Sequence, residues 1–158
     1  VNQARELARR WPGADALRRL LASSDDVADH LEEVSFLLTI PLGEVPAPAG
    51  AVLREMAELV VRGSEEYLRA LECARALQQG RHREDMDDFL AAVDEVMHAE
   101  HVADAVGRRA TAEALTRATD FRQLSLLNDV NRRLEAAIDG LMHVGLTLRE
   151  QVLAEVAA

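Results

Sequence analysis

The sequence predicts an all-α protein, an antiparallel bundle of long helices. Apolar residues recur at three- and four-residue steps over long segments, whereas the period-two alternation typical of strands is missing. Glycine and proline are gathered in a few short clusters, which divide the chain into long uninterrupted stretches. The 158 residues, 49% of them hydrophobic, suffice for one domain with its own core.

The breaks place the helices in order. Pro12 and Gly13 end a short opening helix at about 2–10. The next breaks are a proline- and glycine-rich connection at 41–50, a turn at 80–83 and an N-cap at Thr119–Asp120. The four long helices expected between these breaks cover residues 14–38, 51–79, 84–115 and 120–156.

The expected core consists of apolar stripes on these helices. Aromatic residues make up only 3% of the chain, so leucine, valine and alanine must fill it. In the segment 14–38 the stripe comprises Leu17, Leu20, Leu21, Ser24, Val27, Ala28, Leu31, Val34 and Leu38. In the segment 51–79 it comprises Leu53, Met56, Val60, Gly63, Tyr67, Leu71, Ala74 and Leu77.

Charge and cysteine content exclude several classes of protein. The 28 acidic and 18 basic residues give a formal charge of −10, which argues against binding to nucleic acid or to an anionic leaflet. No apolar stretch is long enough to span a bilayer. Cys73 has no partner for an internal disulfide, so we expect a reducing compartment, the cytoplasm. Nucleotide and phosphate-loop fingerprints are missing, and so is a nucleophile elbow.

Two carboxylates stand where core residues are expected. The apolar stripe of the segment 84–115 comprises Met86, Phe89, Val93, Val96, Met97, Ala103, Gly107, Ala110, Thr111 and Ala114. At about 100° per residue, Glu100 and Asp104 fall in the middle of this stripe. An i,i+4 pair projects from one helix face with Cβ atoms about 6 Å apart. Two buried anions are very unfavourable unless cations neutralise them.

The same spacing occurs twice more, beside the apolar faces of two other helices. Glu135 and Asp139 lie in the last helix, and Asp25 and Asp29 in the segment 14–38. If the three pairs converge, so many oxygen ligands suit Mg, Ca, Mn or Fe. The alternative is that the acids are solvated or paired with arginine. The candidate partners are Arg108 and Arg109 for the first pair and Arg132 and Arg133 for the second.

Two weaker candidates are interpreted as structural. Asp94, His98 and His101 fall at i, i+4 and i+7, a pattern that could hold a transition metal, but they lie on the polar side of their helix and are best explained as a solvated face. Cys73 has no neighbour that would activate its thiol, so it is interpreted as an inert core or boundary residue.

Three runs carry a resemblance to a known family. The runs SDDVADHLEE (24–33), AEHVAD (99–104) and LEAAID (134–139) resemble the repeated motifs of the PhoU-like family, and most closely those of its shorter branch, the Pit accessory proteins encoded beside low-affinity phosphate transporters. The similarity runs from about residue 15 to the end, with the motifs in the same order. The family has a further acidic motif in its early helices, whereas Glu6 here has no acid at i+4.

The resemblance implies a fold, a ligand set and a role. The fold would be two related three-helix bundles in one domain, 1–158, with an N-terminal part (1–79) and a C-terminal part (84–158). The implied metal ligands are Asp25, Asp29, Glu100, Asp104, Glu135 and Asp139. The metal would be iron first, otherwise manganese, zinc or magnesium, with no organic cofactor. The role would be non-enzymatic regulation of phosphate transport, in the cytoplasm and against a transporter at the inner face of the membrane; a homodimer stays open.

Two other functions remain as alternatives. A carboxylate-bridged dimetal enzyme would need Glu-x-x-His ligands on the core stripe, and Glu95 with His98 does not sit there. A metal-free helical interaction domain would pair the acids with arginines and would be indifferent to chelator.

Overall fold

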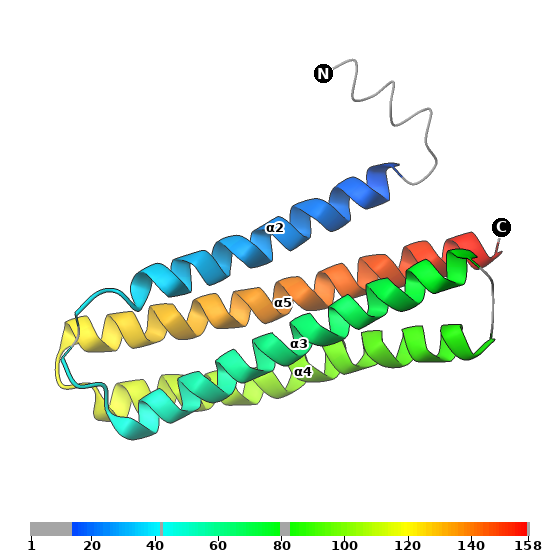
Figure 1. The fold of residues 1–158 in the computed structure, drawn as a ribbon. Coiled ribbons are helices and arrows are strands. Elements are labelled where there is room, and N and C mark those ends of the chain that lie inside the picture. The colour runs from blue at the N-terminus through cyan, green and yellow to red at the C-terminus, as the bar shows by residue number, and fades with distance from the viewer. Residues whose placement is uncertain (1–13, 42, 80–82, 158) are drawn as a thin grey trace, which may run out of the picture.

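The computed structural model describes residues 14–41, 43–79 and 83–157, and Figure 1 shows their four long helices. These are α2 (Ala14–Leu37), α3 (Ala47–Gln79), α4 (Arg83–Arg117) and α5 (Phe121–Ala157). Each runs antiparallel to the helix before it, and no strand occurs in the described part of the chain. The predicted all-α bundle is confirmed. The opening helix expected at 2–10 lies outside the described residues.

Three of the helices form a compact unit, and the fourth lies on its side. α3, α4 and α5 pack against one another, whereas the backbone of α2 comes close to that of α5 alone (Figure 1). Gly140 permits this approach, because a Cβ there would lie 2.6 Å from Val27 Cγ2. An ion pair of 2.8 Å between Arg133 and Glu33 also joins the two helices. None of the described helices contains a stretch long and apolar enough to cross a membrane.

The helix bounds differ from the predicted ones mainly at the start of α3. This helix begins at Ala47 rather than at 51, because Pro48 falls in the first turn, where a missing N–H costs nothing. The Gly50 N–H donates to the Pro46 carbonyl at 3.0 Å and closes that turn. At the start of α5 the predicted N-cap is confirmed, since Asp120 Oδ1 accepts the Gln123 N–H at 2.9 Å.

The core confirms the predicted stripe of α3 and corrects that of α2. Every residue of the α3 stripe is buried or partly buried, and Met56 is fully buried. On α2, in contrast, Leu17, Leu21 and Leu38 are 52%, 63% and 69% exposed, and Ala28 is exposed as well. The prediction that these four are core was wrong because α2 has one neighbouring helix, so only a narrow face of it is covered.

Candidate metal centre

Glu100 and Asp104 lie at the edge of the buried face of α4. The fully covered residues around them are Ala99, Ala103 and Val106, so the core face is centred one residue earlier than the sequence pattern predicts. Glu100 is partly buried, and the Asp104 side chain is 61% exposed. The expectation that both occupy the middle of the stripe was wrong. Within this pair, the cost of burying charge therefore falls mainly on Glu100.

Glu135 and Asp139 lie on α5 at the edge of its apolar face, as predicted. Glu135 is partly buried and lies over α4, where a Cβ on Gly107 would overlap its Oε1 atom. Asn131 holds the carboxylate from one turn earlier, with Nδ2 donating to Glu135 Oε1 at 3.4 Å and to the Gly107 carbonyl at 3.2 Å. Asp139 is exposed on the next turn. The absence of a side chain at 107 thus makes room for a carboxylate between two helices.

The charges of Asp104 and Asp139 act on both glutamates. Burial raises the pKa of Glu100 above its ordinary value, and the charges of Asp104 and Asp139 raise it further. Burial also raises the pKa of Glu135, against the hydrogen bond from Asn131, and the same two aspartates add to the rise. Asp104 and Asp139 therefore lie near both glutamates. We call Glu100, Asp104, Glu135 and Asp139 the α4–α5 carboxylate cluster.

Arginines neutralise this cluster only weakly. Arg108 approaches Asp104 at 3.7 Å, but both side chains are mostly exposed, and ion pairs of this kind contribute little. The three other arginines considered as partners bind elsewhere: Arg109 with Glu55, Arg132 with Asp129 and Arg133 with Glu33. Glu135 and Asp139 therefore do not use the neighbouring arginines that the sequence offers them.

The third predicted pair stands apart from the cluster. Asp25 and Asp29 are exposed on α2, and the charges that raise the pKa of Glu100 and Glu135 include neither of them. Across the residues that the structure describes, no three histidine, cysteine, aspartate or glutamate side chains converge closely enough to hold a metal ion as they stand. A cation at the cluster therefore requires the exposed carboxylates to change rotamer.

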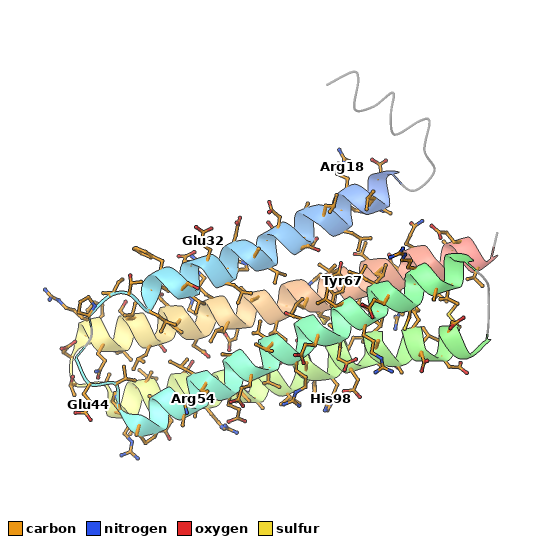
Figure 2. The ribbon with its side chains drawn as sticks, in the orientation of Figure 1. Arg18, Glu32, Glu44, Arg54, Tyr67 and His98 are labelled. Carbon is orange, nitrogen blue, oxygen red and sulfur yellow. The ribbon has the colours of Figure 1, made fainter. Side chains whose placement is uncertain are left out.

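The two weaker candidates have the structural character expected of them. Asp94, His98 and His101 are all exposed on α4, and Figure 2 shows His98 on the outer side of the bundle. Cys73 is partly buried on α3, and burial, followed by the charge of Asp88, raises the pKa of its thiol. A raised pKa keeps the sulfur protonated and unreactive.

Two further residues belong to this site and were missed in the sequence. Asn131 is buried, donates to Glu135 and leaves its own Oδ1 without a hydrogen bond. His143 lies one turn beyond Asp139, with Nδ1 2.8 Å from the Asp139 carbonyl oxygen, and its charge lowers the pKa of Glu100. Extending the i+4 spacing of Glu135 and Asp139 in both directions along α5 would have found both residues.

The raised pKa values predict how stability depends on pH without metal. The folded state holds protons on Glu100 and Glu135 at pH values where the unfolded chain has released them. Ionising them in the folded state therefore lowers the free energy of unfolding as pH rises above about 4, the ordinary range for glutamate. We expect a Glu100→Gln/Glu135→Gln variant in chelator to be more stable than the parent at pH 7, with the difference shrinking on acidification.

Urea denaturation at several pH values measures this difference. The matched control is Glu58→Gln/Glu72→Gln, which removes two exposed glutamates from α3. It should show no comparable gain. A stability difference that stays constant with pH, or that grows on acidification, would contradict the assignment.

The α4–α5 carboxylate cluster offers oxygen ligands from two adjacent helices at a partly covered position. Such a donor set suits hard divalent or trivalent cations. Cysteine takes no part in it. Compared with family models, with curated proteins and with solved structures, the chain finds no match.

Proposed function

We propose that this chain is a non-enzymatic accessory protein that regulates phosphate transport, PhoU-like in type, and that it binds metal ions through carboxylates. One observation supports the metal site above the others. Four carboxylates share a small region between α4 and α5, and the pKa values of Glu100 and Glu135 are raised because burial and the neighbouring aspartates disfavour their charge. A bound cation supplies the positive charge that these groups lack.

The oxygen chemistry of these residues suits such an ion, and the exposed carboxylates would have to change rotamer to converge on it. Glu100, Asp104, Glu135 and Asp139 would hold it, iron first and otherwise manganese, zinc or magnesium. Asn131 would orient Glu135 through its hydrogen bond of 3.4 Å. Because two of the ligands come from α4 and two from α5, binding would join these helices across their interface. Asp25 and Asp29 would serve a second position on α2, since the cluster does not include them.

The proposal also includes the division of the fold into two related bundles and the identity of the partner protein. The resemblance implies two related three-helix bundles, to which α2 and α3 would contribute in residues 1–79 and α4 and α5 in residues 84–158. The protein would work in the cytoplasm and contact a phosphate transporter at the inner face of the membrane. The proposal that the partner is a phosphate transporter rests on the resemblance of the three sequence motifs alone.

A metal-free interaction domain is the second candidate, and one observation favours it. Asp104 is already ion-paired with Arg108 at 3.7 Å, and no three ligands converge among the described residues. This candidate predicts no bound metal and the same stability with and without chelator. The dimetal enzyme finds less support, because Glu95 and His98 are both exposed on α4.

Affinity capture from detergent-solubilised membranes of the organism that encodes the chain tests the regulatory role. We expect a phosphate transporter to be retained by the metal-loaded protein. We expect less of it with a Glu100→Gln/Asp104→Asn variant if metal shapes the binding face. Repeated failure to recover any phosphate transporter with the metal-loaded protein would count against the regulatory role and leave the metal site to be judged separately.

A further inference from the structure

A second feature of the molecule is an apolar pocket at one end of the bundle. It has a volume of about 620 Å³ and is lined in part by described residues of the α2–α3 connection. Figure 1 shows this connection at the left end of the bundle. Its walls are the last turn of α2, the first turns of α3, the connection itself and the α5 residues 126–134. This volume lies within the range typical of pockets for small ligands. The pocket is separate from the α4–α5 carboxylate cluster, and α4 contributes none of the described lining residues.

The rim of the pocket exposes large apolar side chains. Leu38, Ile40 and Val45 line it and are 69%, 40% and 38% exposed. Exposed apolar side chains gathered at one place mark a binding surface more often than scattered ones do. An alkyl chain in the pocket would cover them and gain the hydrophobic free energy of their burial.

One charged residue lies among the described residues that line the pocket. Arg54, on α3, is exposed and has no ion-pair partner in the described part of the chain. Figure 2 shows it near the start of α3, at the same end of the bundle as Glu44. A guanidinium group beside an apolar pocket matches an anionic head group, which it can bind through two parallel N–H donors.

The connection beside the pocket is held in place by α5. Gln123 is 2% exposed; its Nε2 donates to the Glu44 carbonyl at 3.1 Å and its Oε1 accepts the Thr119 N–H at 2.9 Å. Gly43 has a φ of 72°, which glycine adopts without strain. The wall therefore has its shape before a ligand enters, which lowers the entropic cost of binding.

We propose that this pocket binds a single-chain anionic amphiphile, with the alkyl chain among the apolar side chains and the head group, a carboxylate or a phosphate, on Arg54. The apolar lining selects for the alkyl chain, and the cationic side chain of Arg54 selects for an anionic head group. This site is independent of the metal-dependent function proposed above, so either can fail without the other.

Isothermal titration calorimetry with four dodecyl probes, each below its micelle concentration, tests the proposal. Dodecanoate and dodecyl phosphate carry the two candidate head groups, dodecanol is neutral, and dodecylammonium is cationic. We expect saturable binding of at least one anionic probe, about tenfold tighter than dodecanol, as an added charge-assisted hydrogen bond would give. The tighter of the two anions identifies the head group.

Variants locate the binding. Arg54→Gln should weaken binding of the anion about fivefold or more and leave dodecanol unchanged. Ala57→Phe, which fills the pocket from α3, should abolish binding of every probe. The matched control is Arg62→Gln, an exposed arginine of the same helix outside the pocket. The proposal is overturned if no anionic probe binds, if dodecanol or dodecylammonium binds as tightly, or if Arg54→Gln behaves like Arg62→Gln.

Discussion

Replacing Glu100 with glutamine and Asp104 with asparagine should reduce the bound metal from a stoichiometric amount to background. The two substitutions remove both proposed α4 ligands from the α4–α5 carboxylate cluster and keep side chains of the same size. With only Glu135 and Asp139 left, a cation would lose half of its carboxylate ligands and the link between the helices. The measurement is elemental analysis of protein loaded with iron or manganese and then desalted, before and after dialysis against chelator.

Two control variants with the same change in charge sharpen this test. Asp87→Asn/Asp94→Asn removes two exposed acids of α4 outside the cluster and should retain the metal. Asp25→Asn/Asp29→Asn removes the acids on α2 and should lower the amount of metal only if a second position exists there. Stoichiometric metal retained by the Glu100→Gln/Asp104→Asn variant would remove the cluster from the proposed function. Parent protein that never takes up metal would favour the metal-free interaction domain.

Phe89→Ala should be the most destabilising substitution of a single core residue. The Phe89 side chain is fully buried, at 0% exposure, and packs in a cluster with Ala70, Val93 and Val152 from three helices. Removing an aromatic ring from such a position costs about 3–5 kcal/mol, through lost burial and the cavity left behind. Since domains have about 5–15 kcal/mol of total stability, this loss would bring the protein near unfolding at room temperature.

Urea denaturation followed by circular dichroism measures the effect. The control is Phe121→Ala, the same change at the first residue of α5, where the ring is 80% exposed. It should alter the free energy of unfolding by about 0.5 kcal/mol or less. Equal losses for the two variants would contradict the burial that the structure assigns to Phe89.

The helices could be predicted well because their signals are local. Periodicity and the glycine and proline breaks placed all four described helices, and Asp120 marked the start of the last one. The predicted start of α3 is too late because a proline-rich segment is typical of a loop, whereas Pro48 lies in the first turn of this helix. The exposure of Leu17 and Leu21 could not be predicted in this way. It depends on how many neighbours a helix has, and a single-helix pattern does not contain that information.

The candidate site was predicted in outline. The i,i+4 spacing identified the acids of α4 and α5, but a shift of one residue in the buried face moved Asp104 from the core into solvent. The contact between Glu135 and Gly107 depends on the register of two helices, which no pattern in either helix determines. The acid with which each arginine pairs could not be predicted either, because Arg133 binds Glu33, a hundred residues earlier in the chain and on another helix.

The position of α2 has a consequence for how the protein unfolds. The backbone of this helix comes close to that of α5 alone, and its side-chain contacts with α3 include a weak one of 3.5 Å between Ser24 Oγ and the Tyr67 hydroxyl. α3, α4 and α5 cover one another, so they can stay packed while α2 is lifted away. We therefore expect partial opening of α2 to cost less free energy than global unfolding. The end of α2 forms one wall of the apolar pocket. Partial opening of α2 would therefore remove this wall and leave the α4–α5 carboxylate cluster intact.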